Sequence, residues 1–179
     1  MFAAKSNGQA VEPRIPPLSR IARTRKLEFF FSHVEKDAKV LDVGCADGWV
    51  ERWTQAQGFS NVIGLDLVPP ADIVGDVSNW RSLGIAPHSF DAIVAFEVIE
   101  HGDIVGALHE LTRPGGLLLA TTPVPGMDWA CRLMERIGML QRRTSPHSHL
   151  TDLRLLPDFE VVDHRIKGFV SQWGVLRAA

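Results

Sequence analysis

The sequence predicts a doubly wound α/β fold with a mostly parallel sheet and an antiparallel hairpin at its C-terminal end. Apolar runs of strand length alternate along the chain with segments of helical periodicity. The runs are apolar almost throughout, which indicates burial on both faces and therefore parallel strands covered by helices. The last two strand-like runs are separated only by "KGFVSQ", a link too short for a crossover helix.

Four apolar runs predict the main strands, and a weaker fifth run lies between the second and third of them. The four cover residues 40–43, 62–67, 90–98 and 117–121, and the fifth is "ADIVGDV" at 71–77. Helical stripes are formed by Trp49, Val50, Trp53 and Ala56, closed by Gly58, and by Ile104, Val105, Leu108 and Leu111, capped by Asp103 and ended by "RPGG". A last helix is expected around Trp129 to Ile137, before the hairpin of "DFEVVDHRI" and "WGVLRAA".

The two ends of the chain predict its domain organisation. Residues 1–16 are polar, contain Gly and Pro and lack periodicity, so we expect a flexible tail. Residues 17–179 are expected to form a single domain. It begins with a basic amphipathic helix from Leu18, for which packing on the sheet edge is favoured over contact with a membrane, a substrate or nucleic acid.

Composition narrows the classes of protein. With 179 residues, 45% hydrophobic and 22% charged, the chain can bury one sizeable core, and its net charge of −2 gives no general attraction to nucleic acid. Cys45 and Cys131 lack metal-type spacing, which favours a reducing, cytoplasmic location. No apolar run approaches the roughly 18 residues of a membrane span, so we expect a soluble protein without a transmembrane segment.

Small residues mark the turn from the first strand to the first helix, where the ligand crevice of an open parallel sheet lies. Gly44, Ala46 and Gly48 stand in this turn, and Trp49 begins the helix. Small residues let the backbone approach a bound molecule, and the helix amides and dipole face it.

Acids at the strand ends indicate which molecule would bind. Asp66 ends the second strand, where a carboxylate can accept both hydrogen bonds from the vicinal hydroxyls of a ribose. Asp76 ends the weaker strand and could take the exocyclic amine of an adenine, with Val77 packing on the ring. Asp42 lies too deep for solvent and is expected to bond loop amides or a cationic ligand amine. Together they predict a site for an adenosine that carries an amino acid.

Five segments resemble class I S-adenosylmethionine-dependent methyltransferases in order and spacing: "VLDVGCADG", "GLDL", "GDV", "FDAIVAFEVIEH" and "LTRPGGLLLATTP". The resemblance implies a seven-stranded Rossmann-like sheet whose last strand is antiparallel, and S-adenosylmethionine as cofactor, with S-adenosylhomocysteine as product. The methionine part of the cofactor would contact Asp42, Gly44 and Gly48, and its ribose would contact Asp66. Its adenine would contact Asp76 and Val77, and Phe96 would form the floor of the pocket. The expected cofactor-binding residues are Asp42, Gly44, Cys45, Ala46, Gly48, Asp66, Leu67, Asp76, Val77 and Phe96. The family loop usually reads G-x-G-x-G, and here Ala46 takes the middle position.

The segment "EVIEH" resembles ubiquinone-biosynthesis O-methyltransferases and small-RNA 2′-O-methyltransferases, in which this set is associated with a divalent metal. Glu97, Glu100 and His101 could converge if the segment is helical, and His147 and His149 of "SPHSHL" could join them. Three interpretations stay open: a metal site, a metal-free base or acceptor-orienting group, and structural roles. We take Glu97, His101 and His147 as the catalytic candidates; a divalent metal is not favoured.

The function expected from this resemblance is methyl transfer to an oxygen, nitrogen or carbon atom of a small-molecule or lipid-like acceptor. The chain leaves little sequence for a lid, so a second copy or a partner subunit is expected to cover the site of a small acceptor. No DNA partner is expected. The alternatives are a cofactor-binding or regulatory subunit without its own turnover, and a metal-dependent RNA 2′-O-methyltransferase.

Overall fold

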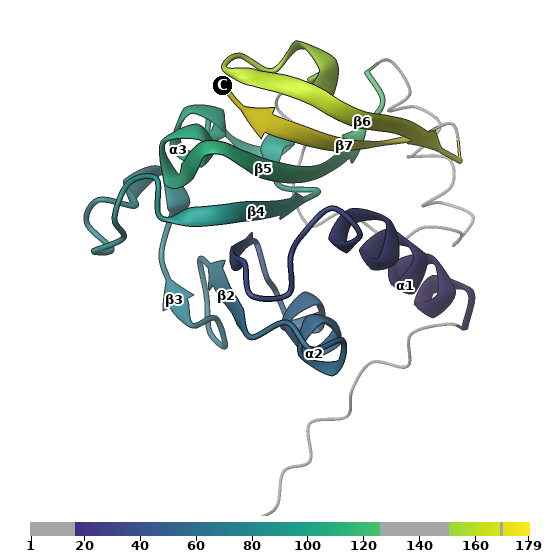
Figure 1. Cartoon of the computed structure of the whole chain (residues 1–179), viewed down its shortest axis with the longest axis horizontal. Coiled ribbons are helices and arrows are strands. Elements are labelled where there is room, and N and C mark those ends of the chain that lie inside the picture. The colour runs from purple at the N-terminus through teal and green to yellow at the C-terminus, as the bar shows by residue number, and fades with distance from the viewer. Residues whose placement is uncertain (1–16, 126–150, 169) are drawn as a thin grey trace, which may run out of the picture.

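The computed structural model describes residues 17–125, 151–168 and 170–179 (Figure 1). The predicted tail, the helix expected around Trp129 to Ile137, and His147 and His149 lie outside these residues. The strands are β1 (Lys39–Val43), β2 (Asn61–Asp66), β3 (Ile73–Val74), β4 (Phe90–Phe96), β5 (Thr112–Pro123), β6 (Phe159–Lys167) and β7 (Ser171–Ala178). The helices are α1 (Pro17–Phe31), α2 (Trp49–Ala56) and α3 (Val105–Leu111), with short 3-10 turns η1 (Val77–Asn79), η2 (Ile99–His101) and η3 (Leu153–Leu155).

The seven strands form one sheet in the order β3-β2-β1-β4-β5-β7-β6. All adjacent pairs are parallel except β5 with β7 and β7 with β6, so β7 alone among these strands runs in the opposite direction. This confirms the predicted mostly parallel sheet and its antiparallel hairpin. β1 has β2 on one side and β4 on the other, so the strand order reverses at β1, and the crevice for a ligand lies at the carboxyl ends of these strands.

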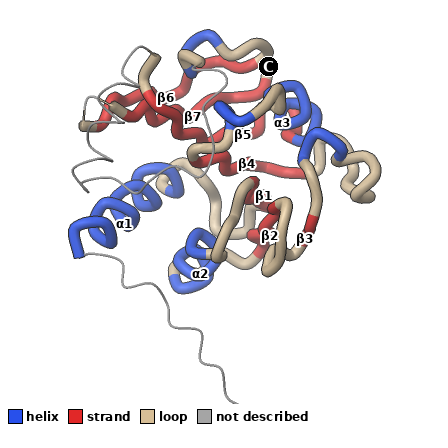
Figure 2. Tube along the Cα trace, turned by 180° about the vertical axis from the view of Figure 1, so that it is seen from behind, coloured by secondary structure: helices blue, strands red, loops and turns tan. Residues whose placement is uncertain are grey.

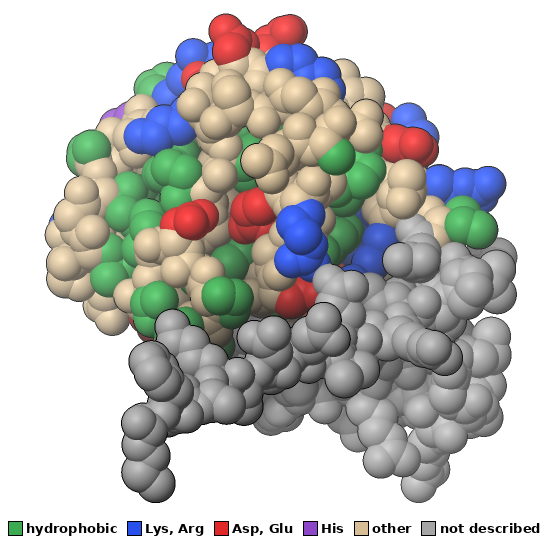
Figure 3. Space-filling view, turned by 90° about the horizontal axis from the view of Figure 1, so that it is seen from below, with side chains coloured by type: hydrophobic (Ala, Val, Ile, Leu, Met, Phe, Trp, Pro, Cys, Tyr) green, Lys and Arg blue, Asp and Glu red, His purple; other side chains and the backbone are tan. Residues whose placement is uncertain are grey.

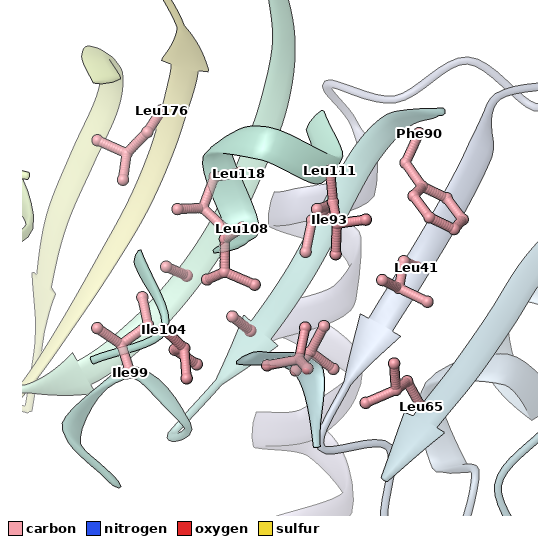
Figure 4. Packing of buried hydrophobic residues seen from close by; sticks show 14 of the residues in the cluster. Leu41, Leu65, Phe90, Ile93, Ile99, Ile104, Leu108, Leu111, Leu118 and Leu176 are labelled. Carbon is pink, nitrogen blue, oxygen red and sulfur yellow. The ribbon is translucent and has the colours of Figure 1, made fainter. Parts of the chain in front are cut away.

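Successive apolar side chains of the central strands point to opposite faces of the sheet and fill two separate cores. Leu41 of β1 and Ile93 of β4 belong to the core covered by α3, which Figure 4 shows. Val40 of β1 and Val94 of β4 belong to the other core, together with residues of α1 and α2. The near-continuous apolar runs thus arise because both faces of each central strand are buried.

Helix α1 packs on the face of the sheet, not on its edge as predicted. Leu27, Phe30 and Phe31 are buried against central strands, and the Phe30 ring lies 5.7 Å from the ring of Trp173 in β7. Figures 1 and 2 show α1 and α2 on the same side of the sheet. The helix therefore covers the centre of the sheet, whereas the edge strands β3 and β6 leave apolar side chains such as Val74 and Ile166 exposed.

Several boundaries differ from those predicted, and three of them lie around β4 and α3. β4 ends at Phe96 rather than Val98, because Glu97 turns the backbone into the left-handed region with φ 57°. The residue before α3 is Ile104 rather than Asp103. Helix α3 ends at Leu111, where the Thr112 hydroxyl donates to the carbonyl of Leu108 (2.7 Å), and "RPGG" belongs to β5.

Within the described residues, none of the helices combines the length and apolar character needed to cross a membrane.

Candidate active site

The loop after β1 is held against the loop after β4. Gly44 has φ 76°, and its N–H donates to the carbonyl of Leu65 in β2 (2.7 Å). A Cβ atom at Gly44 would lie 2.6 Å from Cγ2 of Val98, a separation that real Cβ contacts do not reach. Glycine is therefore required here for two reasons: the positive φ and the close approach of Val98.

Ala46 occupies a conformation that favours glycine. Its φ is 50°, and its N–H donates to Oδ2 of Asp66 (2.9 Å). Two residues later Gly48, with φ 71°, precedes the first residue of α2. The Ala46–Asp66 hydrogen bond joins the loop after β1 to the end of β2, so the alanine that departs from the family pattern still shapes the predicted loop.

The acids predicted for the adenosine part lie in sequence along the sheet edge. Asp66 is half-buried at the end of β2, and Leu67 beside it is exposed. Asp76 precedes η1 and accepts hydrogen bonds from the hydroxyl and the N–H of Ser78 (2.6 and 2.9 Å). These two bonds lower the pKa of Asp76, so it is a carboxylate at neutral pH. Val77 is buried in the α3-side core.

Asp42 and Cys45 lie beneath the same loop, in an acidic environment. Asp42 is only 2% exposed, and its Oδ2 has no hydrogen-bond partner among the described residues. Burial, followed by the charges of Glu51 and Asp66, raises the pKa of Asp42 well above its usual value. Burial and the same acids raise the pKa of the Cys45 thiol to about 12, so this thiol is uncharged and has little nucleophilic character at neutral pH.

Phe96 lies at the end of β4 within a group of rings. Its ring is 4.9 Å from that of Phe30 and 6.1 Å from that of Trp49, the first residue of α2. The ammonium of Lys26 lies 5.0 Å from the Phe96 ring centroid, and the Arg23 guanidinium lies 5.0 Å from that of Trp49. Phe96 is partly exposed and is placed between the glycine loop and helix α1.

The glutamates of "EVIEH" lie in different surroundings. Glu97 is exposed and Oε1 lies 3.9 Å from the ammonium of Lys26. Glu100 is buried in η2 and accepts a hydrogen bond from the hydroxyl of Thr122 (3.1 Å). Burial and then the charge of Glu97 raise the pKa of Glu100 to about 7. The backbone of His101 completes η2, but its side chain, like that of His147, lies outside the description, so convergence with the glutamates stays a prediction.

Lys26 is a site residue that the sequence reasoning missed. It reaches from α1 to the carboxyl ends of β4 and β5, where its ammonium donates to the hydroxyl of Thr121 (3.4 Å). Burial lowers its pKa, Glu97 opposes this shift, and Arg23 adds to it. The sequence places Lys26 three residues after Arg23, so the two share a face of α1, but nothing in this spacing tells them from the other basic residues of the helix.

No group of three or more His, Cys, Asp or Glu side chains within residues 17–125, 151–168 and 170–179 is arranged to hold a metal ion. This finding does not extend to the side chains of His101, His147 and His149. The metal interpretation of "EVIEH" is therefore open at those three histidines.

Comparison with known proteins places this geometry in a family. The sequence model described as methyltransferase domain matches residues 18–156. The chain belongs to this family. The ubiquinone biosynthesis O-methyltransferase of Xylella fastidiosa (strain M23) is 34% identical over 127 residues, 55% of the chain and 51% of the relative. The enzyme of that description from Neisseria meningitidis serogroup C (strain 053442) is 28% identical over 117 residues, 54% of the chain and 49% of the relative.

The chain thus spans about half the length of these curated relatives. Solved structures agree in fold at low sequence identity. The PH0226 protein from Pyrococcus horikoshii OT3 superposes with a TM-score of 0.67 and 17% identity, over 93% of this chain and 94% of that chain. The N-methyltransferase NodS from Bradyrhizobium japonicum WM9, in complex with S-adenosyl-l-homocysteine, gives a TM-score of 0.62 and 16% identity, over 92% and 89%. The predicted Rossmann-like methyltransferase fold is confirmed.

Ala46→Gly is expected to stabilise the protein. A non-glycine residue in the left-handed region is strained by about 1 kcal/mol, and glycine relieves this strain while keeping the N–H that binds Asp66. The measurement is the free energy of unfolding in urea. Ala22→Gly, at an exposed interior position of α1, is the matched control and should have the opposite sign, destabilising by about 0.5–1 kcal/mol. Equal destabilisation by both substitutions would contradict the strain at Ala46.

Glu100→Gln is expected to stabilise the protein more at pH 8 than at pH 5. The pKa of Glu100 is about 7 when folded, against 4.5 for the free group, so the folded state holds the proton more tightly. The contribution of Glu100 to the free energy of unfolding is therefore complete below pH 4.5. It falls by about 2–3 kcal/mol as the pH rises toward 7. Glutamine removes this loss because it stays uncharged. Thermal unfolding of wild type and Glu100→Gln at both pH values measures this difference, with the exposed Glu160→Gln as control. A difference in stability between wild type and Glu100→Gln that does not change with pH would contradict the prediction.

Proposed function

We propose that this chain is an S-adenosylmethionine-dependent methyltransferase whose residues 17–179 form one catalytic domain. The reaction moves a methyl group from the cofactor to an oxygen, nitrogen or carbon atom of a small-molecule or lipid-like acceptor. Among these atoms oxygen is favoured, because the matching curated relatives are described as O-methyltransferases. A second copy or a partner subunit as cover for the site remains part of the proposal.

One observation carries the proposal. At the point where the strand order reverses, the buried Asp42 has an unpartnered carboxylate oxygen directly before a glycine loop that has no room for a Cβ at Gly44. A buried carboxylate without a partner is unfavourable, and a ligand amine would satisfy it. A molecule that combines a cationic amine with groups needing close backbone approach fits this place, and the amino acid part of S-adenosylmethionine has both.

The neighbouring residues fit the rest of the cofactor. Asp66 can accept hydrogen bonds from ribose hydroxyls, with its Oδ2 already oriented by the N–H of Ala46. Asp76 has one oxygen held by Ser78, which leaves the other to accept from an adenine amine. The exposed Leu67 offers apolar surface beside the ring, whereas Val77, which was predicted to pack on the ring, is buried in the α3-side core. Running from η1 to β1, these positions follow the adenine, ribose and methionine parts in order.

The reactive end of the cofactor then points toward the end of β4, where Phe96, Glu97 and Lys26 lie. The cofactor supplies an activated methyl group, so the chain's own residues mainly align the acceptor and exclude water; orientation of this kind can supply roughly 7–11 kcal/mol. Glu97, His101 and His147 remain the proposed groups for removing or holding an acceptor proton. Lys26 joins them because its ammonium lies beside Glu97 and can orient a polar acceptor.

A nucleic-acid acceptor is less well supported. Tight binding of RNA requires a basic surface that contacts several phosphates. On the face shown in Figure 3, the basic side chains of the described residues are interspersed with acidic and hydrophobic ones. Arg23 and Lys26 are directed at aromatic rings of the site, and this arrangement suits a small acceptor better than a phosphate backbone.

Turnover is tested by incubating the protein with methyl-labelled S-adenosylmethionine and a metabolite extract, with and without a chelator. Transfer of label to an extracted compound is expected. Binding of the cofactor without transfer to any compound would favour the regulatory alternative. Loss of transfer in chelator would show that turnover requires a metal.

Asp66→Ala is expected to weaken binding of S-adenosylhomocysteine by about 1–3 kcal/mol, roughly 5- to 150-fold in Kd, because the ribose hydroxyls lose their acceptor. Calorimetric titration measures the effect. Asp66→Asn should be intermediate, since its carbonyl can still accept from Ala46. Asp163→Ala in β6 removes a carboxylate far from the site and should leave Kd unchanged. An unaltered Kd in Asp66→Ala would show that the ribose assignment is wrong.

A further inference from the structure

Glu51 is a half-buried residue whose two carboxyl oxygens are shielded from solvent. It stands in the first turn of α2 and points toward the sheet, where its side chain fills the space beside Gly64 of β2. A Cβ atom at Gly64 would collide with Oε1 of Glu51 and come within 2.8 Å of Sγ of Cys45. The glycine in an otherwise apolar strand therefore makes room for a carboxyl group under the glycine loop.

Burial raises the pKa of this carboxyl group, and its own backbone N–H and the Arg52 guanidinium only partly oppose that shift. Neither oxygen of Glu51 reaches solvent or has a hydrogen-bond partner among the described residues, and the same is true of Oδ2 of Asp42. Asp42 stands beside Gly64 in the register of β1 and β2, and Glu51 fills the space at Gly64, so the two carboxyl groups are neighbours. A hydrogen bond between them requires that one of them carry a proton, because two carboxylates only accept. Two adjacent buried carboxylates cannot both ionise without a large electrostatic cost.

The charges around the pair favour a proton or another cation. Asp66 of β2 and Cys45 of the loop face Asp42, while Asp72 and Asp47 face Glu51. The cation that acts on Glu51 is Arg52 of α2, but this guanidinium is exposed and is bound to the backbone carbonyl and side chain of Asp47. Burial together with these acids raises the pKa of both Asp42 and Glu51.

We propose that Asp42 and Glu51 share one proton in the free protein, and that the α-ammonium group of the bound cofactor replaces this proton and donates hydrogen bonds to both carboxylates. The inference rests on the proposed function, since it requires a ligand with an amino acid part. On binding, the pair with its single negative charge takes up a cationic amine and releases one proton to solvent, so the net charge is conserved. Glu51 is thereby a second acid of the ammonium subsite, and cofactor binding strengthens as pH rises.

The test is calorimetric titration of S-adenosylhomocysteine at pH 7 in phosphate and in Tris, two buffers with different ionisation enthalpies. The dependence of the observed heat on buffer gives the number of protons released. Wild-type protein is expected to release close to one proton per ligand, and Glu51→Gln close to none, because the amide donates to Asp42 without titrating. Glu35→Gln, an exposed acid outside the site, should behave as wild type.

A second ligand keeps the test independent of how well the variant folds. 5′-Methylthioadenosine has the adenosine and the sulfur but no ammonium, so wild-type protein should bind it without releasing a proton. Binding of S-adenosylhomocysteine with equal heats in both buffers from pH 6 to pH 8 would overturn the shared proton and leave the proposed function intact. So would proton release that persists in Glu51→Gln. Absence of any S-adenosylhomocysteine binding would overturn both.

Discussion

The parallel pairing of β1 with both β2 and β4 is the constraint on which the rest of the site depends. In this register Asp42 stands beside Gly64 on one side and Val94 on the other, so three chain turns leave the sheet at the same level. The loop after β1 can then bond to Leu65 and receive Val98 against Gly44. A shift of one residue would invert the side chains of β1 and move Asp42 to the opposite face.

The same register brings negative charges together beneath the loop. Asp42, Glu51, Asp66 and Asp72 act on one another or on the Cys45 thiol, an arrangement that opposes folding of the free protein. Proteins retain such groups where a ligand neutralises or hydrogen-bonds them. The free protein is then less stable, and the affinity for the ligand is higher. The acids on the β4 side differ, since Glu97 has Lys26 nearby and Glu100 has the hydroxyl of Thr122.

The strands and the strand-end acids could be predicted from sequence because each depends on local pattern. The apolar runs located β1, β2 and β4 to within two residues of their ends, with Asp66 as the last residue of β2 and the small residues directly after Val43. Lys26 and Glu51 could not be predicted in this way, because their roles depend on how helices pack on the sheet. The position of α1 is set by aromatic contacts such as Phe30 with Trp173, which join distant parts of the sequence. The left-handed turn at Glu97 was missed because glutamate carries no signal for it.

The contact of α1 with Trp173 has a consequence for the order in which the protein is assembled on the ribosome. Phe29 and Phe30 belong to the first helix, whereas their aromatic partner belongs to the last strand. The first helix emerges early but completes its packing only after the final strand has been translated. Helix α1, which carries Arg23 and Lys26, therefore completes its packing only when β7 is present, and until then its phenylalanines are open to aggregation.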